Sequence, residues 1–385
     1  MTAGPLTAPP AVERVADRAS ARRFVDARVA PIADQYDRAG RVPDTLLHDV
    51  GQAGLWAPFV PVELGGAGLP LSALGPLHEE VGRGCSSLRS LLTVQSMVAY
   101  AILRWGDTAQ REHWLPQLAT GRTPASLCVS EAGAGSDAQG LTTGAVRRAG
   151  GWVLNGTKTW ITGGQRARLF LVFAKADERS ECFLVPSTAP GVEVRPIEDM
   201  LGTRAGMLAT VSLRDALVDD DARIGPVPFA PGMMLTGTLD IGRFSVAAGC
   251  VGILAACVEA CRDYTRARHV GGVPLRELQL IRAKLSNMVT DLSAARLLCE
   301  RAGGLKDAGS PETIMATWIA KYFASVAAAR HASEAVQIHG AHGCGPGSPV
   351  SRLYRDAKVM EIIEGSSEIQ QITIADAAYR TQERS

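Results

Sequence analysis

Hydrophobic residues recur at helical spacing through the first third of the chain, over residues 10–120. Val12, Val15 and Ala19 show the three- and four-residue intervals that place apolar side chains on one face of a helix. Glycine and proline break this pattern over Pro61–Pro70, which predicts an irregular loop between helices. The first third is therefore predicted to be helical.

The period changes in the middle of the chain, from about residue 126 to residue 224. Short apolar runs such as RLFLVFAKA, ECFLVP and VEVRPI are typical of β-strands. The dipeptide Asn155-Gly156 within WVLNGTKTW is a hairpin signal and predicts that the chain reverses there. The middle third is predicted to be an antiparallel β-domain.

Helical periodicity returns from about Gly242 onward. The pairs Gly271-Gly272 and Gly303-Gly304 predict the ends of the first two helices of this region. Ser310 followed by Pro311 predicts the N-cap and first residue of the third helix. The last third is therefore expected to be a bundle of long helices.

The chain has 385 residues, which is too long for one ordinary compact domain. The order helix, sheet, helix predicts an α+β fold with an N-terminal helical domain, a middle antiparallel β-barrel or sandwich domain, and a C-terminal helical bundle. The predicted boundaries are residues 1–122, 123–228 and 229–385. The uncharged stretch Phe244–Val258 falls short of the ~20 residues that a membrane span needs, so it is predicted to be a buried core helix.

Charge and cysteine content narrow the classes of function. Lys+Arg 40 against Asp+Glu 39 give a net charge of +1, which argues against binding to nucleic acid or to an anionic membrane surface. The start MTAGPLTAPP lacks the features of a secretory signal and suggests a loose tail. The cysteines do not have the spacing of a disulfide framework, as expected in a reducing cytoplasm. The protein is therefore expected to act on a small molecule.

Two motifs in the middle third carry candidate chemistry. In LCVSEAGAGSD, from Leu127 to Asp137, a strand runs into a glycine-rich turn whose N–H groups and hydroxyls suit an electron-rich ring edge or a phosphate. In WIT, Trp160 offers a flat face for stacking and Thr162 a donor beside it. Taken alone, the first motif is a tight turn and the second is core packing.

Two further motifs lie in the last third. YTRARHVGGVPLRELQ contains Arg268, a planar fork for pyrophosphate oxygens, although an isolated arginine there would be a solvated helix end. In YRDAKVMEIIEGSSEIQ, Glu364 ends one helix and is followed by Gly365 and the hydroxyl of Ser366, where chain direction changes. Alone, Glu364 would be an exposed helix end. Arg355-Asp356 is interpreted as a local ion pair that braces this helix.

In this order, and spread over nearly the whole chain, the four motifs resemble the acyl-CoA dehydrogenase superfamily. The resemblance implies FAD as cofactor and Glu364 as the base that takes a proton from an acyl thioester. The flavin-binding residues that it implies are Leu127, Val129, Ser130, Gly135, Ser136, Trp160, Ile161, Thr162, Arg268, Gln279, Gln337, Gly340, Ala341, Ser366 and Glu368. The substrate-binding residues that it implies are Arg89, Ser90, Ser136, Asp240, Arg243 and Gly365.

The sequence departs from the family pattern at a few positions. Ala132 stands where most members have proline, and Gly271 where a phenylalanine is usual at the adenine side. The segment QIHGAHG matches the family's flavin-adenine loop, although Ala341 replaces a usual glycine. His339 and His342 in that loop have no acidic or cysteine partner at a suitable spacing, so no metal site is predicted.

The acyl group is indicated by GCSSLRSLLTVQSM, residues 84–97. Arg89 and Ser90 interrupt the apolar wall that fatty-acyl members keep there, although Arg89 alone would be an exposed helix arginine. LRSLLTVQS resembles glutaryl-CoA dehydrogenases, where the arginine-serine pair meets a terminal carboxylate. Together with AKVMEIIEGSSEI, the segment is more similar still to dehydrogenases of hydroxymalonyl- and methoxymalonyl-ACP extender-unit pathways.

The predicted function is therefore oxidation of a short polar acyl group, of glyceryl or hydroxymalonyl type, on an acyl carrier protein (ACP) for polyketide assembly. For such a substrate, Glu364 takes its proton from a hydroxyl or hydrated aldehyde instead of the α-carbon. One alternative is a catabolic short-chain or dicarboxylyl-CoA dehydrogenase that passes electrons to electron-transfer flavoprotein. Another is a catalytically silent homologue. The resemblance also implies a homodimer or homotetramer.

Overall fold

The computed structural model describes residues 12–136, 140–177, 179–225 and 231–382. The first third is helical, as its hydrophobic pattern predicts, and the segment Pro61–Pro70 is irregular apart from one 3₁₀ turn at Val62–Leu64. The predicted N-terminal tail, residues 1–10, and Asp137 of the glycine-rich motif lie outside the described residues. The α-helices of this region are α1 (Arg18–Phe24), α2 (Ala33–Ala39), α3 (Asp44–Gln52), α4 (Leu74–Gly84), α5 (Ser86–Trp105) and α6 (Thr108–Ala119).

The middle third forms one curled sheet in the order β1-β4-β2-β3-β7-β6, with β5 also paired to β4. Its strands are β1 (Ala125–Cys128), β2 (Gly144–Arg148), β3 (Gly151–Ile161), β4 (Leu169–Ala176), β5 (Arg179–Pro186), β6 (Val192–Pro196) and β7 (Ala209–Asp219). The expectation of a wholly antiparallel sheet is wrong at β4, which pairs in parallel with both β1 and β2. Neither partner precedes β4 directly along the chain, so no tight hairpin forces the antiparallel direction.

The hairpin predicted at Asn155-Gly156 is wrong, because both residues lie inside β3. The chain reverses earlier, at the turn Ala149-Gly150 between β2 and β3. At Gly156 the register against β7 shifts, so the dipeptide marks a β-bulge. Glycine is needed there because a Cβ on Gly156 would lie 2.4 Å from the hydroxyl oxygen of Thr143.

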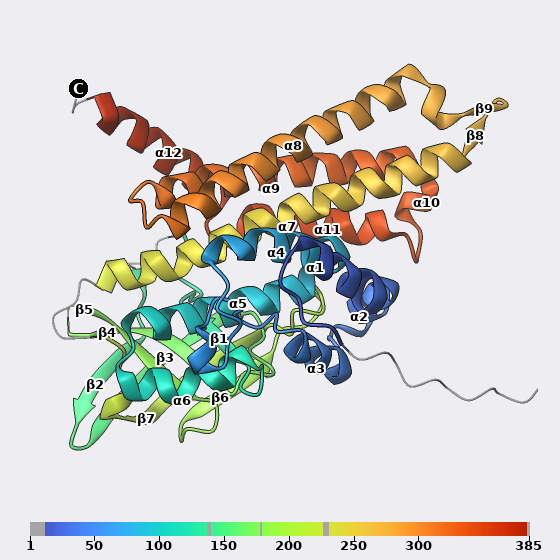
Figure 1. The fold of residues 1–385 in the computed structure, drawn as a ribbon. Coiled ribbons are helices and arrows are strands. Elements are labelled where there is room, and N and C mark those ends of the chain that lie inside the picture. The colour runs from blue at the N-terminus through green and yellow to red at the C-terminus, as the bar shows by residue number, and fades with distance from the viewer. Residues whose placement is uncertain (1–11, 137–139, 178, 226–230, 383–385) are drawn as a thin grey trace, which may run out of the picture.

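The last third is a bundle of long helices, as predicted. Its elements are α7 (Pro231–Ala267), β8 (His269–Val270), β9 (Val273–Pro274), α8 (Gln279–Asp307), α9 (Thr313–His339), α10 (Ala341–Cys344), α11 (Pro349–Ile362) and α12 (Ser367–Gln382). Figure 1 shows α7 running lengthwise through the molecule, with α8 and α9 on one side and α4 and α5 on the other.

The predicted helix ends in this bundle need correction. Helix α7 ends at Ala267, and Gly271-Gly272 forms the turn of the small β8–β9 hairpin instead. Gly303-Gly304 lies inside α8 and does not end it. Glycine at position 303 serves close packing, since a Cβ there would lie 3.2 Å from the ring of Phe244. Helix α9 begins at Thr313, a little after the predicted cap at Ser310-Pro311.

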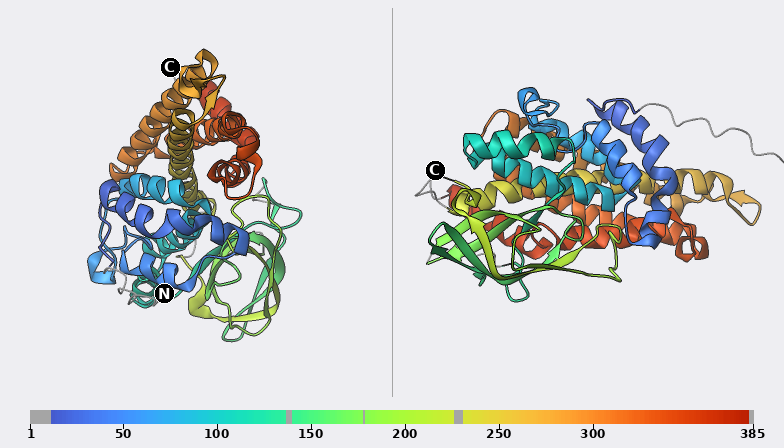
Figure 2. Two further views of the ribbon diagram at one scale, coloured as in Figure 1. Left: turned by 90° about the vertical axis from the view of Figure 1, so that its right-hand side faces the viewer. Right: turned by 90° about the horizontal axis from the view of Figure 1, so that it is seen from below.

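Helix α7 is the core element that joins the three parts of the chain. It is long and apolar enough to cross a membrane by length and composition, but 78% of its most apolar window is buried within the protein. A helix that is apolar all round is expected at the centre of a large bundle. Seen end-on in Figure 2, the C-terminal helices lie above, while the N-terminal helices and the sheet lie next to each other below. This arrangement buries the middle of α7, whereas residues at both of its ends are exposed.

Candidate active site

Glu364 lies in a sharp turn between α11 and α12. Its backbone has φ 57 and that of Gly365 has φ 92, a left-handed conformation that residues with a Cβ disfavour. The ammonium of Lys321 and the amide of Gln370 both donate to the carbonyl oxygen of Gly365, at 2.8 and 2.7 Å. These two bonds hold the strained turn from α9 and α12.

The carboxylate of Glu364 lies directly over α7. A Cβ on Gly242 would be 2.4 Å from its Oε2, so only glycine leaves the carboxylate room. Oε2 is buried and has no hydrogen-bond partner among the described residues, which excludes the exposed helix end as an interpretation. Burial raises the pKa of Glu364, and the positive charges of Arg243, Lys321 and Arg89 oppose that rise. A buried carboxylate oxygen without a partner suits a base that must reach a substrate proton.

Arg243 and Lys321 are buried cations beside this carboxylate. Arg243 donates from Nε to the carbonyl oxygen of Glu364 at 3.1 Å, and its guanidinium lies 4.1 Å from the ring centre of Trp318. Lys321 is fully buried, and burial lowers its pKa to about 8. With Arg89, three positive charges act on this one carboxylate. The cluster therefore favours an anionic ligand or negative charge that develops during a reaction.

Asp240 and Ser90 were predicted to bind substrate, and both are engaged within the protein. Asp240 forms a buried ion pair with Lys306, which also donates to the hydroxyl of Thr317 at 2.9 Å. Only the second carboxylate oxygen of Asp240 lacks a partner among the described residues. The hydroxyl of Ser90 donates to the carbonyl of Ser86 at 2.9 Å and accepts from Arg89 at 3.1 Å. If Asp240 and Ser90 contact the substrate, they do so while they also form these bonds within the protein.

Arg89 on α5 is completely buried, so the exposed helix arginine is excluded as an interpretation. Its guanidinium also donates to the hydroxyl of Thr93 at 2.9 Å and to the sulfur of Met360 at 2.9 Å, while Nε is without a partner. Across the described part of the chain, no carboxylate forms an ion pair with Arg89. A Cβ on Gly249 of α7 would lie 2.7 Å from its Nε. Arg89 is thus a buried cation without a partner anion.

Glu364 and Arg89 lie along the same face of α7. Gly242 contacts the carboxylate and Gly249 contacts the guanidinium. These two glycines are seven residues apart, which is close to two helical turns and corresponds to about 10 Å along the axis. The prospective base and the unpaired cation are therefore separated by a short span.

The predicted flavin residues of β1 and β3 lie next to one another. Ser126 donates from its hydroxyl to the carbonyl of Thr162 at 2.7 Å, and the N–H of Thr159 donates to the carbonyl of Ser130 at 2.9 Å. Trp160 has φ 60 and is 57% exposed, which excludes core packing as its role. An exposed indole at the end of a rigid strand is well suited to stack on a flat ring system.

Glu131, which the sequence reasoning missed, organises the glycine-rich turn. Its carboxylate accepts from the buried ammonium of Lys158 at 2.8 Å and from the hydroxyls and N–H groups of Thr142 and Thr143. Burial disfavours the charge, but these bonds outweigh it and lower the pKa of Glu131. The only sequence signal is an acidic residue inside the glycine-rich motif and a lysine two positions before Trp160.

The remaining predicted residues differ in exposure. Leu127, Val129, Gly365 and Ser366 are half-buried, Ile161 is buried, and Gly135, Ser136 and Glu368 are exposed. A hydrogen bond from Ser366 lowers the pKa of Glu368. The predicted Arg355-Asp356 ion pair is wrong, because Arg355 pairs with Asp37 and Asp356 accepts from the N–H of Thr203 at 2.6 Å. Adjacent helix residues point in different directions, which explains the separate partners.

The predicted ADP-binding residues are not brought to the Glu364 cluster within one chain. These residues are Arg268, Gln279, Gln337, Gly340 and Ala341, and all of them are exposed. They lie around the β8–β9 hairpin and α10, at the end of the bundle away from the sheet (Figure 1). Beside them, Tyr264 stacks on His339 with ring centres 4.2 Å apart. Among the described residues, no group of histidine, cysteine or acidic side chains is placed to hold a metal ion.

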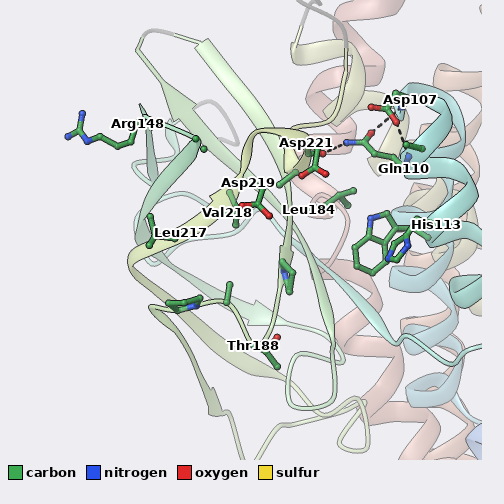
Figure 3. Close-up of a pocket in the computed structure, with 18 of the residues that line it drawn as sticks. Asp107, Gln110, His113, Arg148, Leu184, Thr188, Leu217, Val218, Asp219 and Asp221 are labelled. Carbon is green, nitrogen blue, oxygen red and sulfur yellow. Dashed lines mark hydrogen bonds between the residues drawn. The ribbon is translucent and has the colours of Figure 1, made fainter.

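A cavity of about 830 Å³ lies elsewhere, between α6 and the sheet (Figure 3). Asp107, His113, Asp219 and Asp221 are among its lining residues. Gln110 donates to the carbonyl of Asp221 at 2.7 Å and so connects α6 to the 3₁₀ turn Asp220–Ala222 that follows β7. None of the residues predicted to bind flavin or substrate lines it.

Sequence models of three acyl-CoA dehydrogenase domains match the chain: the N-terminal domain over residues 13–122, the middle domain over 126–216 and the C-terminal domain over 233–379. The chain belongs to the acyl-CoA dehydrogenase family. Rat mitochondrial short-chain specific acyl-CoA dehydrogenase is 37% identical over 373 residues, which cover 94% of this chain and 89% of the relative.

Two solved structures of the family are informative. FkbI, described as serving biosynthesis of the methoxymalonyl extender unit of the FK520 polyketide, has a TM-score of 0.87 and 35% identity, and covers 95% of this chain and 99% of its own. Glutaryl-CoA dehydrogenase from Mycobacterium smegmatis, solved with FADH2, has a TM-score of 0.89 and 29% identity over 94% and 93% of the two chains. FAD is the cofactor of the family, and the exposed Trp160 and the buried cationic cluster beside Glu364 fit it.

Proposed function

We propose that this acyl-CoA dehydrogenase oxidises a short polar acyl group, of glyceryl or hydroxymalonyl type, carried as a thioester on an ACP for polyketide extender-unit biosynthesis. The observation that carries this proposal is the buried guanidinium of Arg89, which has no partner anion among the described residues. A buried charge is costly unless it is paired and hydrogen-bonded. A carboxylate at the end of the acyl group supplies the missing anion and a hydroxyl supplies a further polar acceptor, whereas an alkyl tail supplies neither.

The spacing of the cluster limits the length of this acyl group. The two glycines of α7 that contact Glu364 and Arg89 are about two helical turns apart, roughly 10 Å along the axis. At about 1.5 Å for each C–C bond, and with a contact distance at each end, this span accommodates only a few carbons. The proposal therefore favours a short acyl group over a fatty-acyl chain.

Each residue of the cluster has a proposed role in the reaction. Glu364 takes the proton from the α-carbon, or from a hydroxyl or hydrated aldehyde of an oxygenated substrate, and its raised pKa suits proton abstraction. The N–H of Glu364 donates to the thioester carbonyl and stabilises the negative charge that develops there. Arg243 holds the carbonyl of Glu364 and so orients the turn. FAD, when bound, supplies the acceptor for the hydride.

We propose that the two groups of predicted flavin residues act from different subunits. In the proposed arrangement Ser130, Trp160 and Thr162 hold the flavin ring, while Arg268 and Gln279 contact the ADP portion of FAD bound by another copy of the chain. Exposed apolar side chains on α8, such as Leu280 at 80% and Leu297 at 65%, support burial of that helix in a homodimer or homotetramer.

Two other functions compete with this proposal. A catabolic short-chain or dicarboxylyl-CoA dehydrogenase that reduces electron-transfer flavoprotein is favoured by the similarity to the rat short-chain enzyme. CoA and ACP present the same phosphopantetheine arm, so the contacts around Arg89 do not distinguish them, and FkbI supports the ACP carrier. A silent homologue is disfavoured by the arrangement of Glu364, Arg243 and Trp160. A cytoplasmic location stays a prediction.

The proposal is tested by anaerobic flavin reduction with glyceryl, glutaryl and butyryl thioesters, each offered on CoA and on ACP. We expect the fastest bleaching with the glyceryl group on ACP. Faster bleaching with butyryl-CoA or glutaryl-CoA, followed by electron transfer to electron-transfer flavoprotein, would establish the catabolic alternative. Bound flavin that none of the six thioesters reduces would favour the silent homologue.

A further inference from the structure

A chain of buried hydrogen bonds leads to Arg89 from two other helices. The Nδ1 atom of His78 on α4 lies 2.6 Å from the hydroxyl of Ser245 on α7. That hydroxyl lies 2.5 Å from the hydroxyl of Thr93 on α5, to which Arg89 donates from Nη1 at 2.9 Å. All four side chains are almost completely inaccessible to solvent. Three helices therefore meet at one polar chain inside an otherwise apolar core.

The direction of the bonds follows from the protonation state of His78. Burial, together with the charge of Arg89, lowers the pKa of His78 to about 3, so its ring is neutral at physiological pH. Its Nε2 has no partner among the described residues, and an unpaired lone pair costs less than an unpaired N–H. The proton therefore sits on Nδ1 and is donated to Ser245. Ser245 then donates to Thr93, which donates to the backbone carbonyl of Arg89 at 2.9 Å.

This arrangement satisfies each hydroxyl of the chain and leaves the charge of Arg89 uncompensated. Thr93 uses its proton on the Arg89 carbonyl and its lone pairs on Ser245 and Arg89. Neither Thr93, Ser245 nor His78 is anionic. The chain therefore fixes where the guanidinium lies without neutralising it.

The other side of the guanidinium has one neutral partner and one weak partner. Nη2 donates to the hydroxyl of Ser90 at 3.1 Å and to the sulfur of Met360 on α11 at 2.9 Å. A thioether is a poor acceptor on a flexible side chain, so an oxygen of a bound acyl group displaces it with a net gain. One edge of Arg89 is thus held by Thr93, and on the opposite edge the thioether of Met360 is a replaceable partner beside the hydroxyl of Ser90.

We infer that His78, Ser245 and Thr93 are positioning residues that hold Arg89 for the polar end of the acyl group, and so set the acyl specificity of the enzyme. This inference rests on the proposed role of Arg89. A preorganised guanidinium binds an oxygen anion more strongly than a mobile one, because no side-chain ordering is needed when the substrate arrives. The same three residues leave the binding of an alkyl group unaffected.

The test compares kcat/KM for glutaryl-CoA with kcat/KM for butyryl-CoA in the flavin-loaded enzyme. We expect Ser245→Ala to lower the glutaryl-to-butyryl ratio about tenfold, the effect of one buried hydrogen bond in a charged network, with the butyryl value unchanged. Ser96→Ala is the matched control, since Ser96 is equally buried and its hydroxyl has no partner among the described residues. It should leave the ratio at the wild-type value.

Further variants separate positioning from packing. Thr93→Val keeps the shape but loses the hydroxyl and should lower the ratio, whereas Thr93→Ser should retain it. His78→Asn keeps a donor near the Nδ1 position and should retain the ratio that His78→Leu loses. These pairs remain informative if Ser245→Ala does not fold. Equal losses for both substrates in Ser245→Ala and Thr93→Val would overturn the inference and assign the chain to core stability.

A double variant distinguishes the inference from the function on which it rests. In an Arg89→Met background, Ser245→Ala should have no further effect on the ratio, because the group that it positions is gone. Additive losses would contradict the inference while leaving the proposed role of Arg89 intact. An unchanged ratio in Arg89→Met itself would instead contradict the proposed role of Arg89, on which the proposed function rests.

Discussion

The ammonium of Lys321 donates to the carbonyl oxygen of Gly365 at 2.8 Å, which joins a fully buried cation on α9 to the turn that holds Glu364. The bond has a mechanical and an electrostatic consequence. It fixes the residue after a glutamate whose φ of 57 is unfavourable. It also places a positive charge where it opposes the rise in the pKa of Glu364 caused by burial.

Replacing Lys321 with methionine removes this charge while keeping a similar volume. Because the ammonium stabilises the ionised form of Glu364, we expect the pKa of Glu364 to rise further and the acid limb of the kcat profile to move about one unit to higher pH. Lys358→Met is the control, since Lys358 pairs with Glu361 at the surface of α11. A uniform loss of rate at all pH values in Lys321→Met would mean that the lysine stabilises the structure of the turn and does not shift the pKa of Glu364.

The contact between Gly242 and Glu364 makes a steric prediction. In Gly242→Ala, a Cβ placed 2.4 Å from Oε2 displaces the carboxylate, and we expect about a hundredfold loss in kcat with normal FAD content. Gly304→Ala is the matched control, because Gly304 is in a helix and its Cβ would meet nothing within 4 Å. That variant should keep full activity and gain about 0.5–1 kcal/mol of stability. Full activity in Gly242→Ala would show that the carboxylate need not occupy this position.

Trp160 is predicted to contribute to FAD binding and little to folding. Its side chain is 57% exposed, so Trp160→Ala should leave the Tm of the flavin-free protein nearly unchanged. Loss of stacking is expected to raise the Kd for FAD about 10- to 100-fold, and Trp160→Phe should recover most of that loss. Titration of the flavin-free protein with FAD measures both effects. A drop in Tm without a change in Kd would return Trp160 to a structural role.

Asp356 is predicted to make the free energy of unfolding depend on pH. Burial raises its pKa from 3.8 to about 6, although Arg352 and the N–H of Thr203 favour the charged form. A raised acid pKa contributes stability below pH 3.8 that is lost as the pH rises through 6, here about 3 kcal/mol at most. Asp356→Asn keeps an acceptor for Thr203 and does not titrate. Between pH 4 and 7, the free energy of unfolding of wild type should therefore fall relative to that of Asp356→Asn.

Unfolding of wild type, Asp356→Asn and the surface control Asp376→Asn by urea over this pH range tests the assignment. The difference between Asp356→Asn and wild type should level off above pH 7, whereas Asp376→Asn should follow wild type throughout. A constant difference at every pH would show that Asp356 is ionised in the folded protein over the whole range.

The sequence predicted the order of elements well because hydrophobic period is a local property. It failed where a glycine serves packing. Gly303 allows close contact with Phe244, and Gly156 with Thr143, and neither neighbour is close in sequence. The same residue type marks a helix end or a turn in isolation, so the pattern gave the wrong interpretation at both places.

The sequence motifs predicted which residues form the site, but they did not predict its electrostatics. Nothing local indicates that Arg89 is completely buried, or that Ser245 and His78 from two other helices reach it through Thr93. Likewise, the bond between Lys321 and Gly365 joins α9 to the turn before α12. These contacts depend on how α7 packs against α4, α5 and α9, which is decided by the tertiary structure.

The central claim is that Glu364 is the base of a flavin-dependent dehydrogenation, and Glu364→Gln tests it most directly. Glutamine keeps the size of the side chain but cannot accept the proton. We expect the variant to retain FAD at wild-type stoichiometry and to bind thioesters, while anaerobic bleaching of the flavin by the best substrate slows by at least about a thousandfold. Bleaching at the wild-type rate in FAD-loaded Glu364→Gln would contradict the account.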